Sequence, residues 1–144
     1  MTPAPQRLPR SGRVLQPADF SRIYARRASA ASGPLVLYAC PRADAAAEAR
    51  LGLSVSRRIG NAVVRNRWKR RLREAFRVVR SRLAAGNDYV IVVRSGLAPG
   101  GAAGARETEE ALVALAARVT GRPGYATAPA PGRPGTRPGR GRKG

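Results

Sequence analysis

The 144 residues include 28 lysines and arginines, eight acidic residues and no histidine, which gives a net charge of +20. This charge makes nucleic acid the expected partner, ahead of an anionic membrane surface, and the lack of histidine excludes the usual general base, triad partner and imidazole metal ligand. The single cysteine, Cys40, excludes an internal disulfide and fits a reducing cytoplasm, and no apolar run approaches the ~18–20 residues that cross a bilayer.

Both ends of the chain are expected to be disordered. Residues 1–13 are basic and proline-rich, and glycine, proline and arginine dominate residues 121–144. Setting aside the six cations of the tail and the three of the first segment leaves 19 cations against all eight acidic residues, a net charge of +11. The single domain expected over residues 14–120 is therefore strongly basic in itself.

The first predicted elements are one helix and two strands. "QPADFSRIYARR" (16–27) indicates a helix, with Pro17 in its first turn and Phe20, Ile23 and Tyr24 on one face. "ASAASG" (28–33) is typical of a linker, and "PLVLYAC" (34–40) of a short apolar strand. "RLGLSVS" (50–56) alternates strictly, which favours a half-buried strand in an antiparallel pair.

A long helix is predicted from Asn61, a good N-cap residue, to about Leu83. Its apolar residues fall within a ~120° arc, as expected of a helix that packs on a core. They are Val64, Trp68, Leu72, Ala75, Phe76, Val79 and Leu83, and Trp68 is expected in the core.

"YVIVVRSG" (89–96) is apolar on both faces and is expected to be a central strand. "LAPGGAAGA" (97–105) is predicted to be a loop and "RETEEALVALAARV" (106–119) a final helix. Three or more strands covered by helices indicate an α+β fold, a two-layer sandwich of a mixed sheet with helices. Because a strand follows the long basic helix, that helix is expected to form a βαβ crossover.

The sequence offers no catalytic or metal site. Cys40 lies in an apolar strand, where a lone thiol usually packs without reacting. The acidic residues show no pair suited to two metal ions, and "APGGAAG" (98–104) lacks the ending of a phosphate-binding loop. An enzyme complete in this chain is therefore not expected.

Nine cations lie between Arg57 and Arg77, with Glu74 as the one carboxylate among them. Lys69, Arg73 and Arg77 follow one another at four-residue spacing, where like charges cost a few tenths of a kcal/mol per pair. A phosphate bound between these cations would replace their repulsion by attraction to its negative charge. The excess of arginine and the amides of Asn61 and Asn66 favour RNA, although Asn61 is equally well explained as a simple helix cap.

Three aromatic residues form a second candidate site. Phe20 and Tyr24 share a helix face and Tyr38 lies in the first apolar strand, so the three could line a groove where a single strand stacks, at ~1–3 kcal/mol per base. Packing in the core explains Phe20 somewhat better than stacking does, and leaves Tyr24 and Tyr38 open between the two.

At "SVSRRIGNAVVRNRWKRRLREAFR" (54–77) the chain resembles the protein subunit of bacterial ribonuclease P. The Arg65-Asn66-Arg67 core, the preceding "GNAV" and the trailing Lys69 and Arg70 match that family's signature in order and spacing. The resemblance extends through "ADFSRIY", "LVLY" and "DYVIVVRSG", over roughly residues 7–119.

The resemblance implies a fold like the second domain of a small-subunit ribosomal protein, with a left-handed crossover. It also implies two RNA partners, the catalytic RNA of ribonuclease P and precursor tRNA, whose 5′ leader that RNA removes with Mg²⁺ that the RNA mainly binds. The residues implied to contact the catalytic RNA are Arg57, Arg58, Asn61, Arg65, Asn66, Arg67, Lys69, Arg70 and Arg73. Phe20, Tyr24 and Tyr38 are implied to contact the leader, and no residue of the protein is catalytic.

Three alternatives stay open on the sequence. One is a ribosomal or other RNA-binding protein without a role in cleavage. The others are a DNA-binding or nucleoid protein and a factor that binds anionic membranes. The membrane is the weakest of these, because Leu72, Phe76 and Val79 are needed for the core.

Overall fold

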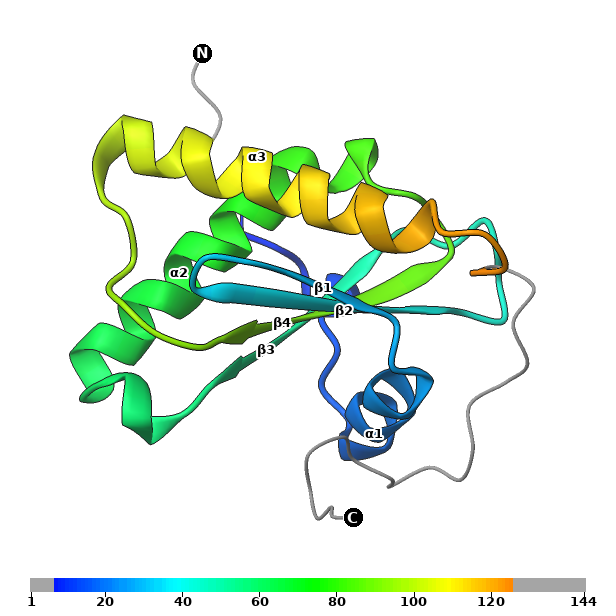
Figure 1. Cartoon of the computed structure of the whole chain (residues 1–144), viewed down its shortest axis with the longest axis horizontal. Coiled ribbons are helices and arrows are strands. Elements are labelled where there is room, and N and C mark those ends of the chain that lie inside the picture. Colours follow the sequence, from blue (N-terminus) through cyan, green and yellow to red (C-terminus); the bar gives the residue numbers. More distant parts are fainter. Residues whose placement is uncertain (1–6, 126–144) are drawn as a thin grey trace.

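The computed structural model describes residues 7–125 (Figure 1). Short 3-10 helices, η1 (Arg10–Gly12), η2 (Arg57–Ile59) and η3 (Arg80–Arg82), accompany the regular elements. In chain order the helices and strands are α1 (Pro17–Arg26), β1 (Ser29–Ser32), β2 (Leu35–Pro41), β3 (Arg50–Val55), α2 (Ala62–Val79), β4 (Asn87–Val93) and α3 (Gly101–Thr120).

The four strands form one mixed sheet in the order β1-β2-β4-β3. β2 pairs antiparallel with β1 and with β4, whereas β3 pairs parallel with β4. The antiparallel pairing expected for residues 50–56 is therefore wrong, and the crossover through α2 explains why, since parallel neighbours need such a connection. The α+β fold with a mixed sheet and the central place of β4 are confirmed.

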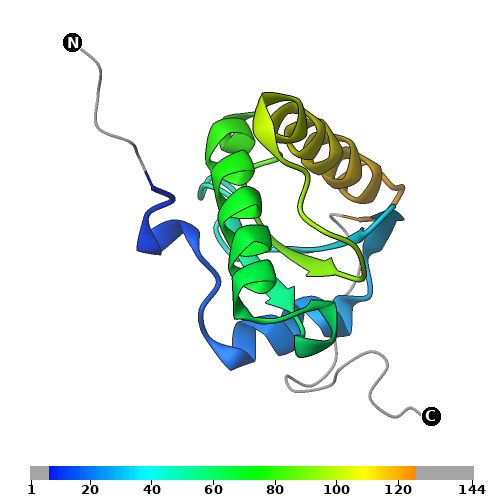
Figure 2. The same ribbon diagram turned by 90° about the vertical axis from the view of Figure 1, so that its left-hand side faces the viewer.

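Alternation along the strands divides the buried side chains between the two faces of the sheet. α2 and α3 cover one face and the shorter α1 crosses part of the other (Figures 1 and 2). The larger core lies under α2 and α3 and includes Trp68, Phe76 and Tyr89. A smaller cluster under α1 is formed by Val14, Ile23, Cys40 and Val90. Trp68 is 1% exposed, so its prediction as a core residue is confirmed.

Two segments differ from the sequence-based expectation. Residues 29–32, expected in a linker, form the edge strand β1, because a tight turn with Gly33 at φ +54° folds them back onto β2. α3 begins at Gly101, inside the expected loop. Gly104 permits this early start. Because it has no side chain, the first turn of α3 can pack against Pro99, whose carbonyl carbon would lie 2.5 Å from a Cβ at position 104. Segments of small residues without a periodic hydrophobic pattern can thus form a strand or a helix when the rest of the fold offers a surface for them to pack on.

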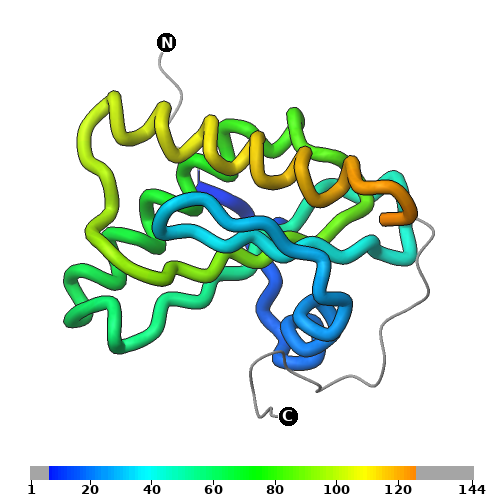
Figure 3. The backbone as a smooth tube through the Cα atoms, in the orientation of Figure 1, coloured from blue at the N-terminus to red at the C-terminus, as the bar shows by residue number. Residues whose placement is uncertain are grey.

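The N-terminal segment is ordered from residue 7, contrary to the disorder expected over residues 1–13. The dark blue tube of Figure 3 leads from this segment to α1 on the far side of the sheet. Leu8 is 3% exposed, and the Val14 N–H donates to the Leu51 carbonyl at 2.9 Å. Burial of an apolar side chain of this size stabilises by ~1.5–3 kcal/mol, about the cost of ordering one or two residues, and the burial of Val14 adds a similar amount. Residues 1–6 lie outside the described part.

The chain after α3 is anchored through Tyr125, so part of the expected disorder over residues 121–144 is also corrected. Its hydroxyl donates to Asn87 Oδ1 at 2.6 Å, and the Arg26 guanidinium lies 5.2 Å from the centre of its ring. Burial raises the pKa of the neighbouring Tyr89 to about 12, so this hydroxyl remains a donor, to the Ala84 carbonyl at 3.1 Å. Residues 126–144 lie outside the described part.

Candidate nucleic-acid interface

The basic helix α2 is set in place at its first turn by Asn61. The Asn61 Oδ1 accepts a hydrogen bond from the Val64 N–H at 3.0 Å, which confirms the predicted N-cap. Arg65 reinforces the same turn, because its Nε donates to the Gly60 carbonyl at 3.2 Å. Within residues 7–125 no side-chain hydrogen bond occupies the Asn61 amide nitrogen, so this donor is the part of the residue left for a ligand.

α2 buries one stripe and turns its cations away from it. The buried residues are Trp68, Leu72, Ala75, Phe76 and Val79. The Trp68 Nε1 donates to the Gly96 carbonyl at 3.0 Å, which fixes the rotation of the helix on the sheet. Because the helix is held from that side, the remaining faces present arginine and lysine to solvent.

We call the nine predicted RNA-contacting residues of η2, the α2 N-cap and α2 the cationic surface: Arg57, Arg58, Asn61, Arg65, Asn66, Arg67, Lys69, Arg70 and Arg73. Arg65, Lys69 and Arg73 are partly buried and the other six are exposed. Within residues 7–125 none of its arginines or its lysine forms an ion pair, whereas Arg77 pairs with Glu74 and Arg80 with Glu48. The surface therefore keeps its full positive charge free for an anion.

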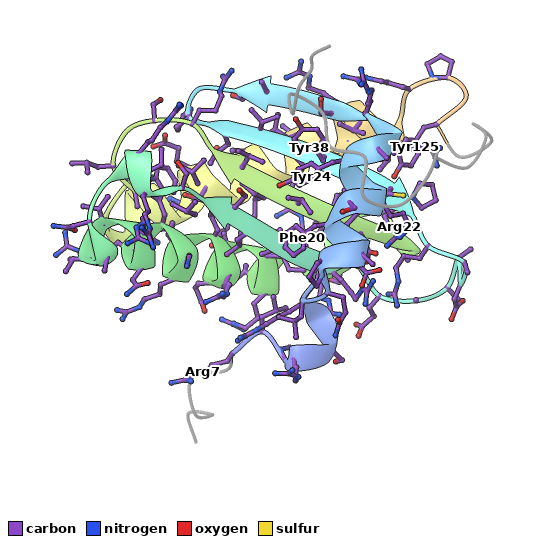
Figure 4. All side chains as sticks on the ribbon, turned by 90° about the horizontal axis from the view of Figure 1, so that it is seen from below. Arg7, Phe20, Arg22, Tyr24, Tyr38 and Tyr125 are labelled. Carbon is purple, nitrogen blue, oxygen red and sulfur yellow. The ribbon has the colours of Figure 1, made fainter. Side chains whose placement is uncertain are left out.

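The predicted aromatic residues also come together, on the opposite face of the sheet. Phe20 and Tyr24 project from α1 and Tyr38 from β2 (Figure 4). The Tyr24 and Tyr38 rings meet edge to face, with centroids 5.0 Å apart, and the Phe20 and Tyr24 centroids are 6.4 Å apart. All three are partly buried, so we call them the aromatic cluster.

Gly52 in β3 makes room for this cluster. A Cβ at Gly52 would lie 2.9 Å from Cε1 and Cζ of Phe20, so the ring rests directly on the strand. Val14, Ile23, Cys40 and Val90 form the floor below the rings. The cluster thus combines packing with partial exposure, and this leaves aromatic surface available for stacking.

A buried carboxylate beside the aromatic cluster escaped the sequence analysis. Asp88, in β4, is 0% exposed and accepts hydrogen bonds from Arg50 Nε and Nη2, both at 2.7 Å, and from Arg22 Nη2. Arg42 Nε lies 3.6 Å from the same carboxylate. The one signal in the sequence is an acidic residue directly before an apolar strand. This signal does not indicate which arginines bind the carboxylate.

These contacts tie α1 and β3 to the central strand, and they also occupy the Cys40 thiol. The hydrogen bond to Asp88 raises the pKa of Arg50 above its usual value. Arg22 Nη1 lies 3.1 Å from the Cys40 Sγ, and burial raises the pKa of this thiol. A protonated, buried thiol is a poor nucleophile.

Neither metal-binding groups nor membrane spans are found in the described part of the chain. Across residues 7–125 no three cysteine, aspartate or glutamate side chains gather as metal ligands would. Over the same residues every helix is too short or too polar to span a bilayer.

Comparisons with known proteins agree with one another. A family model described as Ribonuclease P matches residues 8–119. The ribonuclease P protein component of Brevibacillus brevis is 44% identical over 88 residues, which are 61% of this chain and 69% of that protein. That of Shouchella clausii is 41% identical over 83 residues, 58% of this chain and 67% of its own.

Solved structures give the same result. A Staphylococcus aureus RNase P protein, a mutant described as defective in mRNA degradation activity, aligns with a TM-score of 0.61 and 32% identity over 77% of this chain and 89% of that one. The RNase P protein of Thermotoga maritima aligns with a TM-score of 0.50 and 26% identity, over 63% of this chain and 82% of that one.

Proposed function

Because this chain belongs to the ribonuclease P protein family, we propose that it is the protein subunit of a ribonuclease P particle in the cytoplasm. In this role it binds the catalytic RNA and the 5′ leader of precursor tRNA, and the RNA itself hydrolyses the bond that frees the mature tRNA 5′ end. The observation that chiefly supports this is the cationic surface, whose charges have no carboxylate partners within residues 7–125.

The cationic surface faces the catalytic RNA in this proposal. Each guanidinium offers a planar fork of donors that matches two phosphate oxygens, and each contact releases counterions from the RNA. Arg57 and Arg58 are exposed at the start of the surface, next to the free N–H groups of the α2 N-terminus. That end of a helix also favours phosphate. Neutralising the RNA locally lets its strands approach one another at lower ionic strength.

Mg²⁺ belongs to the RNA in this proposal. The ion prefers oxygen ligands and keeps several waters, so phosphates of a folded RNA suit it. The protein contributes by supplying fixed positive charge, which lowers the concentration of Mg²⁺ needed to fold and load the RNA.

The aromatic cluster takes the leader. Phe20, Tyr24 and Tyr38 offer ring surface at the junction of α1 and β2. A base stacked on such a ring contributes ~1–3 kcal/mol with little dependence on sequence, which suits leaders of varied sequence.

Reconstitution tests the proposed function. Purified protein is added to ribonuclease P RNA and a labelled precursor tRNA, and 5′-leader release is followed at several Mg²⁺ concentrations. We expect the protein to stimulate cleavage most at low Mg²⁺, and to cleave nothing without the RNA. Tight RNA binding without stimulation would contradict the proposal and favour an RNA-binding protein with no role in cleavage.

Phe20→Leu tests the leader assignment. Leucine keeps an apolar side chain above Gly52 but removes the ring, so affinity of the holoenzyme for precursor tRNA should fall by about 10-fold, equivalent to ~1.4 kcal/mol of stacking. Affinity for mature tRNA, which has no leader, should stay unchanged. Equilibrium binding of both RNAs measures the ratio, and an equal loss for both would count against the assignment.

A further inference from the structure

The N-terminal segment and α2 together enclose a basic cleft. It is lined by Arg7, Leu8, Arg13, Asn66, Lys69, Arg70, Arg73 and Glu74, and its volume is about 500 Å³. In Figure 2 the dark blue N-terminal segment lies beside the green α2, and Figure 4 labels Arg7 on this segment. The sequence suggested only one of these walls, the helix.

Contacts with the domain hold the N-terminal wall in position. Leu8 is buried, and the Arg13 Nε donates to the Leu8 carbonyl at 3.1 Å. The backbone of Arg13 also forms an isolated parallel β-bridge with Leu51 of β3. At Gly12 a Cβ would lie 2.9 Å from Leu8 Cδ1 and 3.1 Å from the Arg80 guanidinium carbon, so the segment packs closely. Arg13 therefore enters the cleft from a fixed backbone.

Residues 7–125 do not compensate the positive charges in the cleft. The lining of the cleft has one carboxylate, that of Glu74, against five cations: Arg7, Arg13, Lys69, Arg70 and Arg73. That carboxylate already accepts hydrogen bonds from Arg77, and among residues 7–125 none of the five cations has an ion pair. Burial, and then the positive charge of Arg13, lower the pKa of Arg73. Crowding of like charges across a cleft favours occupation by an anion.

We infer that the basic cleft is a phosphate-binding site, in which Arg13 of the N-terminal segment and Arg73 of α2 hold the same phosphodiester of the RNA from opposite walls. A cleft of about 500 Å³ is too small for a folded RNA element but accepts backbone phosphates. Asn66 adds a neutral amide, able to meet a 2′-hydroxyl beside the phosphate. The N-terminal segment is then part of the RNA interface, and it extends the cationic surface by Arg7 and Arg13. The choice of RNA as the source of the phosphate rests on the proposed function.

The first test uses inorganic pyrophosphate and no RNA. An anion that binds the folded protein raises its melting temperature as its concentration increases. We expect this rise for the wild type and for Arg122→Ala, a matched loss of charge at an exposed residue beyond α3. Arg73→Ala and Arg7→Ala should weaken it. Arg7 is exposed and has no side-chain hydrogen bond within residues 7–125, so its removal leaves the fold intact. An equal rise in Arg7→Ala, Arg73→Ala and the wild type would overturn the inference.

The second test uses ribonuclease P RNA and a double-mutant cycle. Arg13→Ala and Arg73→Ala should each lower affinity several-fold, and the double variant should flatten the salt dependence of log Kd by about 0.7–0.9, the value for a single phosphate. If both hold one phosphate, the double variant should lose less than the product of the two single losses. Fully independent losses would overturn the shared site. If pyrophosphate binds as expected but the wild type does not bind ribonuclease P RNA, the phosphate site is supported and the proposed function is contradicted.

Discussion

Replacing Asp88 with alanine is expected to lower the free energy of unfolding by about 3–5 kcal/mol, because it leaves buried positive charge without a partner. The Asp88 carboxylate is fully buried and binds both Arg22 and Arg50. The two arginine side chains are only 28% and 21% exposed, so water cannot fully replace the carboxylate. Urea unfolding measures the effect. The midpoint should fall while the slope of free energy against urea stays the same.

Two controls separate this effect from the general charge of the protein. Glu107→Ala removes an exposed acidic residue of α3 and reports what one lost negative charge costs in a chain of net charge +20. Asp88→Asn keeps the shape of the side chain and its hydrogen-bond acceptor, and should lie between Glu107→Ala and Asp88→Ala. A loss below ~1 kcal/mol for Asp88→Ala would mean that Arg22 and Arg50 escape to solvent and that the network adds little stability.

The double substitution Arg67→Ala/Arg70→Ala is expected to weaken binding of ribonuclease P RNA by roughly 100-fold or more. Both side chains are exposed on α2 and neither has a hydrogen bond or an ion pair within residues 7–125. A hydrogen bond to a charged group contributes about 1.5–3 kcal/mol, so two lost phosphate contacts amount to at least ~3 kcal/mol. The salt dependence of log Kd should flatten by about 1.4–1.8. Filter binding at several salt concentrations gives both quantities.

The matched control is Arg118→Ala/Arg122→Ala, which removes the same charge at the far end of α3. Arg122 is exposed, and within residues 7–125 the Arg118 guanidinium makes one hydrogen bond, to the Ala31 carbonyl at 3.2 Å, which is also exposed. We expect this variant to bind RNA nearly as the wild type does. Equal losses in the two double variants would mean that the RNA responds to total charge, and the cationic surface would not be a specific site.

Together the two experiments distinguish two uses of arginine in one small protein. Arg22 and Arg50 are bound to Asp88 and hold α1 and β3 to the central strand. Arg67 and Arg70 have no ion pair within residues 7–125 and face solvent. The first pair should matter for stability and the second for binding, and the sequence alone does not tell the two pairs apart.

The sequence by itself determined the features that depend on neighbours a few residues away. The N-cap at Asn61, the buried stripe that includes Trp68, and the outward cations of α2 all follow from the helical period. The charge density and the motif around Arg65-Asn66-Arg67 also indicated the family. These predictions succeeded because helix capping and amphipathicity are local properties of the chain.

Only the tertiary structure decided what depends on residues far apart in the chain. Asp88 meets Arg22 across 66 positions and Arg50 across 38, and no short-range pattern specifies such pairs. Likewise Gly52 is needed because the Phe20 ring lies on it, and the N-terminal segment is ordered because Leu8 finds a place in the core. Burial and charge pairing are set by which surfaces the fold brings together, and this information is spread over the whole chain.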